Sequence, residues 1–450
     1  MSKFALLFLC MVFGGSVAAL FAAPVFAFLV YQLIYFVNPA IRWWASTIPG
    51  IPYSFIASSL MILVLGLRYK ALSELAPWRR QPIFKWLVLL LLMYVLTTYV
   101  AILPSAHKQF TLDLAKLFII ILVAYKLINT EKALDACLWV YVLGCTYLGY
   151  MAYVHGRNAY GRVEGIGMVD TGGGSNMAGA AMVPALVFLM YMAWLGNRKV
   201  KLLAVFCGAL IANGLVLINS RGAFLGVVAG CGFFLMHMIF SRYRRKGQRA
   251  MAIVTIIMGI SGGLYVADDT FWERMQTLQT VEEDPGASGS HRIDFWLATF
   301  DVIDDYPFGV GILGFIEVSP HYLPEHYFEN RDIGKATHST WFQIFSELGW
   351  PGPVLLIALL VSVLRMSRQT KKYVVCRGQY EVYFKILALE GGLLGFLVAA
   401  SFIDRARAEV LYWLVLFLAV AANIYYLRSG KATASARSTR LNARTAGSKP

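Results

Sequence analysis

Apolar segments long enough to cross a membrane recur along nearly the whole chain, separated by short polar stretches. An α-helix needs about 20 predominantly apolar residues to span a bilayer, and only helices or closed barrels satisfy their backbone hydrogen bonds there. The pattern predicts an all-α, polytopic membrane bundle. Its spans are expected over residues 52–67, 84–102, 110–126, 135–154, 178–196, 200–218, 222–240, 249–266, 342–364, 383–402 and 409–427.

The first apolar block, roughly residues 4–37, is too long for one simple span and short for two. Lys3 and the alanine-rich segment 18–23 resemble a secretory signal peptide, but the apolar run continues past Pro24. We therefore expect an uncleaved, kinked first pass with one net crossing. The prediction then amounts to about twelve crossings, with both termini on the cytoplasmic side.

Basic residues are concentrated in the loops on one side of the predicted bundle, and this bias sets its orientation. Clusters of Lys and Arg lie at 68–85, 198–201, 242–249 and 365–377, and the tail beyond 428 adds more. Such loops stay in the cytoplasm. The same distribution argues against a nucleic-acid surface, despite a net charge of +15. The external side then receives 38–51, 103–109, 155–177, 219–221, 267–341 and 403–408.

A composition of 58% hydrophobic and 14% charged residues favours one membrane domain over several soluble ones. Of the six cysteines, five lie in apolar runs and Cys376 lies in a basic loop, so we expect neither disulfides nor a cysteine metal site. The predicted parts are N-terminal transmembrane helices (1–266), an external loop or cap (267–341), C-terminal transmembrane helices (342–428) and a disordered cytoplasmic tail (429–450).

The long external region carries two segments with helical spacing, 271–275 and 293–300, and ends in a polar stretch that contains His338. That stretch leads directly into an apolar helix beginning near Trp341. An imidazole at the mouth of a membrane bundle can accept or donate a proton near neutral pH. The alternative is an interfacial His that caps the start of the helix.

Two arginines stand out on the predicted external side. Arg221 lies between apolar runs that end near Ile218 and begin near Ala223, where an unpaired guanidinium is costly. It either binds a ligand or extends toward the interface. Arg292 is one of few bases in an acidic loop, and its planar fork suits phosphate oxygens. The alternative for Arg292 is a salt bridge to Asp294 or another nearby acid.

Other external groups leave their roles open. The glycine-rich run 172–176, ending at Asn176, either presents backbone N–H groups to an anion or is a flexible connector. Asp404, Arg405 and Arg407 form either an ion network between helices or a substrate contact. Glu347 and Glu390 are expected to be buried hydrogen-bonding groups. No metal is expected, because His321 and His326 lack further ligands and the acids Glu282, Asp284, Asp304 and Asp305 form no recognisable ligand set.

Four motifs occur in order: Ser220-Arg-Gly-Ala223, Arg292-Ile-Asp-Phe-Trp296, Tyr306-Pro-Phe-Gly-Val-Gly-Ile-Leu-Gly-Phe315 and a segment from His338 to Gly352. With the long loop between the expected spans, they resemble the bacterial O-antigen ligase/polymerase superfamily, most densely over 200–352. Family members usually have Asn after the motif His, whereas this chain has Ser339. In having Ser339 after the motif histidine, the chain resembles the branch of the superfamily that comprises O-glycosylation ligases.

The resemblance implies an inner-membrane enzyme that transfers a glycan from undecaprenyl diphosphate to lipid A-core on the periplasmic face. Arg221 and Arg292 would bind the diphosphate, and His338 would act as general base in a metal-independent, inverting displacement that needs no cofactor. Arg162, Asn176, Asp404 and Arg405 would be further substrate contacts. Membrane lipids are the other expected partners. Alternatives are an O-antigen polymerase, a protein O-oligosaccharyltransferase or, in a different class, a lipid-linked sugar flippase.

Overall fold

The structure is a computed structural model that describes residues 2–159, 161–172, 174–243, 245–276, 291–328 and 334–428. Within these ranges the chain forms helices and no β-strand, which confirms the all-α prediction. The expected disordered tail, 429–450, and the acids Glu282 and Asp284 lie outside the described residues.

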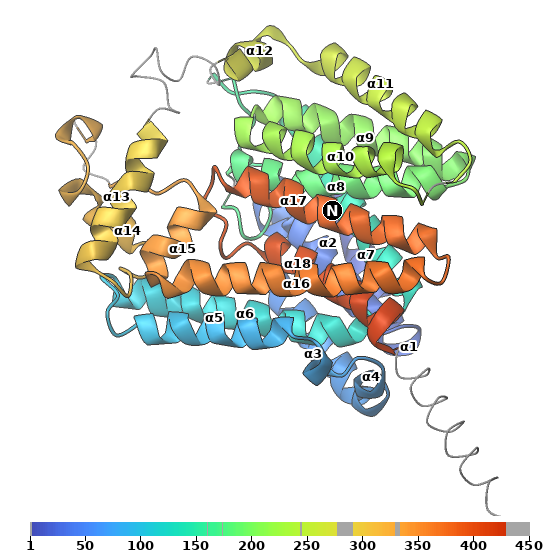
Figure 1. Cartoon of the computed structure of the whole chain (residues 1–450), viewed down its shortest axis with the longest axis horizontal. Coiled ribbons are helices and arrows are strands. Elements are labelled where there is room, and N and C mark those ends of the chain that lie inside the picture. The colour runs from blue at the N-terminus through green and yellow to red at the C-terminus, as the bar shows by residue number, and fades with distance from the viewer. Residues whose placement is uncertain are drawn as a thin grey trace, which may run out of the picture.

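Most of the long helices run roughly parallel or antiparallel to one another (Figure 1). The first half of the chain forms α1 (Lys3–Phe21), α2 (Val25–Val37), α3 (Tyr53–Leu67), α4 (Tyr69–Leu75), α5 (Ile83–Thr97), α6 (Pro104–Leu127), α7 (Glu131–His155), α8 (Ser175–Leu195) and α9 (Arg198–Ile218). The second half forms α10 (Arg221–Phe240), α11 (Gln248–Val266), α12 (Asp269–Gln276), α13 (His291–Asp305), α14 (Gly314–Val318), α15 (Thr340–Leu348), α16 (Pro351–Val375), α17 (Tyr380–Ala400), α18 (Glu409–Ala422) and a π-helical turn (Asn423–Leu427).

By length and composition, nine helices in the described ranges can cross a membrane, or up to ten if the bent pair at Arg68 counts as one span. This is fewer than the predicted crossings. The helices α2 and α5 are apolar but short. The helix α6 is long enough, but it carries Lys108, Asp113, Lys116 and Lys126 along its length. The prediction of a polytopic bundle is confirmed. Because α2 and α5 are short and α6 is charged, these helices need packing against their neighbours to lie at membrane depth.

The helix ends define two opposite faces. One face carries segments 38–52 and 401–408 together with α12–α15, and we call it the loop face (Figure 1). Its segments are tied together: Arg42 Nη2 donates to Gly167 O at 3.3 Å, and Arg405 Nη2 to Asp170 Oδ2 at 2.9 Å. The other face carries the loops that follow α3, α10 and α16, where the predicted basic clusters gather, and we call it the basic face.

The first apolar block folds back on itself, so the prediction of one kinked pass is wrong. A Cβ on Gly15 would lie 2.5 Å from Val30 Cγ2, which shows how closely α1 and α2 pack. The Phe8 ring lies 5.3 Å from that of Tyr53, so the chain starts on the loop face, opposite Arg428. Proline at 24 supplies the break because it donates no backbone hydrogen bond. Apolar length alone did not reveal it.

A stripe of small residues draws α10 against α17 and thereby places Arg221. A Cβ on Gly226 would lie 2.5 Å from Gly395 O, and one on Gly222 would lie 3.2 Å from Ala399 O. Small residues four apart allow two helix backbones to approach this closely. The start of α10 therefore lies beside the end of α17, directly below segment 401–408.

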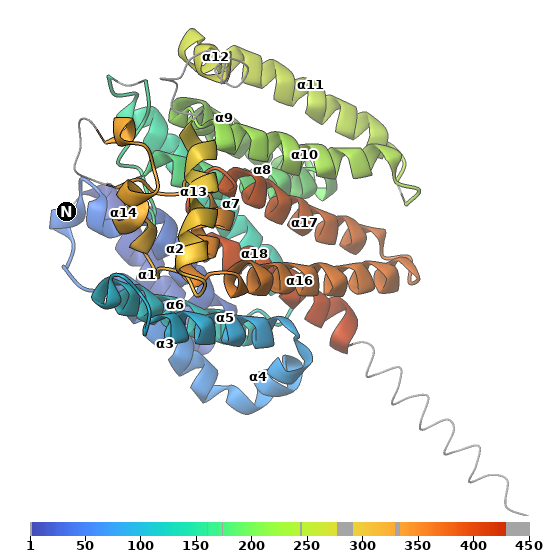
Figure 2. The same cartoon turned by 60° about the vertical axis from the view of Figure 1, so that its left-hand side comes forward.

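On the loop face, α13 and α14 lie across the ends of the membrane helices (Figure 2). The predicted helical pieces at 271–275 and 293–300 are confirmed, as parts of α12 and α13. Phe295 and Val302 of α13 are buried against Val310 and Phe315, which form a small core separate from that of the bundle. This small hydrophobic core stabilises the arrangement of α13 and α14 on the loop face.

The span predicted over 342–364 is in fact two helices, because α15 ends at Leu348 and α16 begins at Pro351. Gly349 has φ +65°, and a Cβ there would lie 2.1 Å from Pro307 O, so only glycine fits the break. The neighbouring segment satisfies the end of α15: the N–H groups of Val310 and Gly311 donate to Ser346 O and Glu347 O at 2.9 and 3.0 Å. The glycine-rich motif 306–315 thus holds α15 in place.

Candidate functional site

Four arginines from four separate segments meet in one small pocket on the loop face, which we call the arginine pocket. Arg162 precedes α8, Arg221 begins α10, Arg274 belongs to α12 and Arg292 to α13. Among the described residues, no Asp or Glu lines this pocket. Its full lining is Arg162, Asn176, Ser220, Arg221, Gly222, Arg274, Arg292, Phe402 and Ile403.

Two helix N-termini add to the positive potential of the arginine pocket. Asn176 lies in the first turn of α8, and Ser220 caps α10, accepting a hydrogen bond from Ala223 N at 3.4 Å. Asn219, just before that cap, takes a left-handed conformation (φ +55°) that turns the chain sharply from α9 into α10. Helix N-termini carry unsatisfied N–H groups and about half a positive charge. The arrangement is suited to a multiply charged anion.

The pKa values of the arginines in this pocket also favour binding of an anion. Burial lowers the pKa of Arg292, and Arg221 and Arg162 lower it further, while Asp404 opposes them. Burial also lowers the pKa of Arg162. Clustered guanidinium groups thus disfavour one another's charge when the pocket is empty. A bound anion would remove that cost.

The alternative role for Arg292, a salt bridge to Asp294, is not what the structure shows. Arg292 Nη1 donates to Phe402 O at 3.2 Å, and the Asp294 carboxylate accepts instead from the Tyr327 hydroxyl. That hydrogen bond and burial raise the pKa of Tyr327 to about 12. Asp294 is therefore occupied elsewhere, and Arg292 faces the arginine pocket.

His338 sits in a tight turn directly before α15, with φ +51°, a conformation that non-glycine residues rarely adopt. Asp404 holds both of its neighbours. Asp404 Oδ1 accepts from Thr337 Oγ1 at 2.7 Å and from Ser339 N at 2.9 Å. On the other side, Trp296 Nε1 donates to Thr337 O at 3.0 Å. The strained turn is fixed by its surroundings, which is typical of functional residues.

His338 is an exposed residue, although protein surrounds much of its ring. Partial burial lowers its pKa, Asp404 raises it, and Arg292 and Lys335 lower it again. The outcome is a pKa below the usual value for histidine, so the ring is neutral at physiological pH and able to accept a proton. Asp404, which contacts both neighbours of His338, directly follows Phe402 and Ile403 of the arginine pocket, so His338 lies near that pocket.

Of the two roles left open for the charged hairpin, the contacts show an ion network for its arginines. Arg405 is buried and ion-paired to Asp170 at 2.9 Å. Arg407 is ion-paired to Glu347, which also accepts from Tyr94 Oη at 2.9 Å. Glu347 and Glu390 are both buried and hydrogen-bonded, as predicted.

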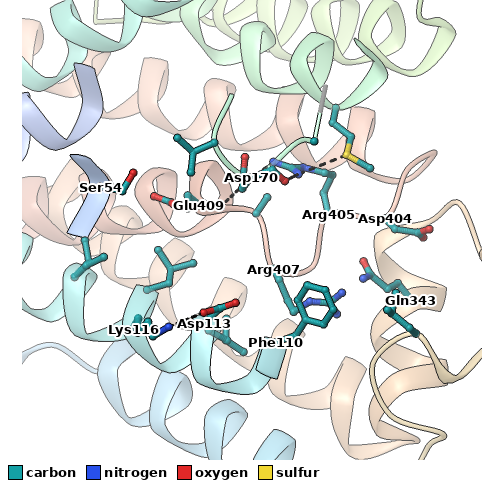
Figure 3. Close-up of a pocket in the computed structure, with 18 of the residues that line it drawn as sticks. Ser54, Phe110, Asp113, Lys116, Asp170, Gln343, Asp404, Arg405, Arg407 and Glu409 are labelled. Carbon is teal, nitrogen blue, oxygen red and sulfur yellow. Dashed lines mark hydrogen bonds and ion pairs between the residues drawn. The ribbon is translucent and has the colours of Figure 1, made fainter. Parts of the chain in front are cut away.

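A larger cavity of about 1030 Å³ opens beside the same hairpin. Thr337 and Asp404 line it at the His338 end, and α3 and α6 form its far wall. Arg405, Arg407 and Glu409 project toward it from the hairpin and the start of α18 (Figure 3). Ile403 lines the arginine pocket while Asp404 lines this cavity, so the hairpin separates the two spaces.

The structure thus brings together most of the residues that the sequence singled out. Arg162, Asn176, Arg221 and Arg292 share the arginine pocket, and Asp404 contacts both neighbours of His338. Arg274 was missed, because in the sequence it is one charge in a short amphipathic segment, Phe271-Trp-Glu-Arg-Met275. In the described ranges, no three His, Cys, Asp or Glu side chains gather as metal ligands would.

Fold and site together define a polytopic all-α membrane protein with a pocket of four arginines on its loop face, linked to His338 through Asp404 and its neighbours Phe402 and Ile403. Residues 206–357 match the family described as O-Antigen ligase, a region that includes Arg221, Arg292 and His338. This match covers about a third of the chain and supports an O-antigen ligase-family protein. No curated protein matches it.

Proposed function

We propose that the protein transfers a glycan from undecaprenyl diphosphate to a sugar hydroxyl of lipid A-core, without a metal. The observation that carries this is the arginine pocket beside His338. It offers a diphosphate four guanidinium groups and two helix N-termini, with no Asp or Glu among the described lining residues. The match of residues 206–357 to the O-antigen ligase family supports an enzyme of this kind.

In the proposed reaction, a nitrogen of the neutral His338 ring removes the proton of the acceptor hydroxyl. That oxygen forms a bond to the anomeric carbon, on the face opposite the leaving group. The bond from the anomeric carbon to the diphosphate oxygen breaks, and its electron pair stays on the undecaprenyl diphosphate. Arg221 and Arg292 would stabilise the charge that develops there. His338 then releases its proton, and the anomeric configuration is inverted.

The charge bias supports one orientation. Lys and Arg gather in the loops of the basic face, and loops rich in these residues usually stay in the cytoplasm. The loop face, with His338 and the arginine pocket, would then face the periplasm of a bacterial inner membrane. Arg162, Arg274 and Asn176 would be further contacts to the diphosphate.

The direct test is product formation by the purified full chain with lipid-linked glycan and lipid A-core in the presence of EDTA. We expect ligated product at an undiminished rate. Complete loss on chelation, restored by a divalent ion, would contradict the metal-free mechanism. Parallel reactions with a growing glycan and with a pilin-like protein separate a ligase from a polymerase and a protein O-oligosaccharyltransferase.

Arg221→Lys is expected to lower kcat/KM by about tenfold or more, because lysine keeps the charge but loses the bidentate fork. Arg198→Lys is the matched control, since Arg198 begins α9 as Arg221 begins α10, but on the basic face. The control should retain full activity. Equal activity of the two variants would remove Arg221 from the diphosphate site.

Asp404→Asn is expected to shift the acid limb of the kcat/KM profile to lower pH. A general base works in its neutral form, so activity rises as pH passes through its pKa. The Asp404 charge raises the pKa of His338, and asparagine removes the charge while keeping an acceptor oxygen for Thr337 and Ser339. A profile displaced to higher pH, or one that does not move, would be inconsistent with this role. Asp404→Ala, which loses both hydrogen bonds, should also lower the plateau.

A further inference from the structure

The cations that line the large cavity are neutralised by carboxylates, unlike those of the arginine pocket, and this difference affects which ligand the cavity can bind. Its three cations are each paired with a carboxylate that also lines it. Lys116 Nζ lies 2.8 Å from Asp113 Oδ1, and Arg405 is paired with Asp170 (Figure 3). Arg407 is paired with Glu347. No other Lys, Arg or His of the described chain lines the cavity.

Asp404 and Glu409 also line the cavity, and neither forms an ion pair within the described residues. Asp404 is held by Thr337 and Ser339, and Glu409 Oε2 and Tyr31 Oη share a hydrogen bond at 2.8 Å. A phosphate entering this space would find each cation of the described lining already paired, and it would meet the Asp404 carboxylate. Like charges brought together at a partly buried site repel one another strongly. The cavity is therefore unsuited to a phosphorylated group, in contrast to the arginine pocket on the other side of the hairpin.

The far wall of the cavity is apolar and follows two membrane helices. Phe55 and Ile62 of α3 line it and are largely exposed, and Leu114, Leu117 and Ile120 of α6 face them across the same space. Ser54 and Ser58 are uncharged polar groups on the same wall. A ligand with a hydrophilic head near His338 and an alkyl chain along α3 and α6 would match both ends.

We propose that this cavity holds the acceptor, and that it selects an amphiphilic glycan whose sugars next to the reacting hydroxyl carry no phosphate. The inference rests on the proposed function. It adds that charge orients the two substrates: the diphosphate enters the arginine pocket, and the phosphate-free acceptor approaches His338 from the opposite side of the hairpin. Such an approach brings the hydroxyl and the leaving group to opposite sides of the reacting carbon.

The first test compares two synthetic dodecyl glycosides as acceptors, one neutral and one with a phosphate monoester on its sugar, away from the reacting hydroxyl. With the full chain and lipid-linked glycan, kcat/KM for the neutral glycoside should be higher by about tenfold or more. Equal use of both glycosides would overturn the inference. If neither these glycosides nor lipid A-core gives product, the proposed function itself fails.

The second test removes the carboxylate that is paired with one cation of the cavity, Lys116. Asp113→Asn leaves Lys116 without its partner, and the pair is exposed on both sides, so folding should be unaffected. Relative use of the phosphorylated glycoside should rise by about threefold. The double variant Asp113→Asn/Lys116→Gln removes the pair entirely, and its relative use of the phosphorylated and neutral glycosides should return to the wild-type ratio. If the single and double variants give the same ratio, charge in the cavity does not select the acceptor.

The third test locates the acceptor. Ser58→Trp places a bulky ring on the α3 wall and should raise the KM for the neutral glycoside by about tenfold while leaving the KM for the lipid-linked donor unchanged. Leu63→Trp, on the same helix and exposed but outside the cavity lining, is the control and should leave both constants unchanged. A rise in the donor KM instead would show that the cavity holds the donor.

Discussion

His338→Ala is expected to lower kcat by about 10²–10⁴-fold, with product formation falling toward the limit of detection. His338 precedes α15 and is linked to the arginine pocket through Asp404, and its neutral ring is the group that we propose takes the acceptor proton. Diphosphate binding should persist, because the four arginines are untouched. The measurement is the single-turnover rate with saturating donor and acceptor, together with the affinity for undecaprenyl diphosphate.

The backbone at His338 calls for a second variant. Alanine tolerates φ +51° poorly, so a loss of activity in His338→Ala combines loss of the ring with backbone strain. His338→Asn removes the base but suits the left-handed conformation, and it should be as inactive as the alanine variant. His321→Asn, on the same face and exposed, should keep wild-type activity. Substantial turnover by His338→Asn would show that His338 shapes the turn rather than accepting the proton.

Glu347→Gln is expected to have the largest effect on stability, about 3–5 kcal/mol, because it leaves the Arg407 guanidinium in the protein interior without its counter-charge. Burial disfavours the charged form of Arg407, yet the Glu347 carboxylate more than compensates and raises the pKa of Arg407 overall. Glu347 also accepts from Tyr94 and Gln343 Nε2. These groups fix α15, and with it the turn at His338, to α5 and the hairpin.

Thermal unfolding in detergent should therefore show a clear drop in Tm for Glu347→Gln. The double variant Glu347→Gln/Arg407→Met removes the uncompensated charge as well, and should recover part of the loss. Asp113→Asn breaks a pair that is exposed on both sides and should change stability by less than about 1 kcal/mol. An unchanged Tm in Glu347→Gln would mean that this ion pair does not hold α15.

Much of the site was predictable residue by residue, because an ionisable group between apolar runs is conspicuous. Arg221 is such a group, and His338 ends a long polar region. Arg162, Asn176 and Arg292 are predicted from their position in external loops. Arg274 gave no comparable signal, since a single arginine in a polar loop is usually solvated. The pairing of Arg405 with Asp170 was equally hidden, because 235 residues separate them in the chain.

The sequence by itself determined the helical class, the position of most helices and the side on which positive charge gathers. These properties follow from local hydrophobicity and loop charge, which act through partition into the bilayer and need no knowledge of partners. Only the tertiary structure decided that α1 and α2 fold back, that α15 and α16 are separate, and that four arginines share one pocket. Those outcomes depend on close approach at Gly15, Gly226 and Gly349 and on buried ion pairs between distant segments. Apolar length carries no information about which surfaces meet.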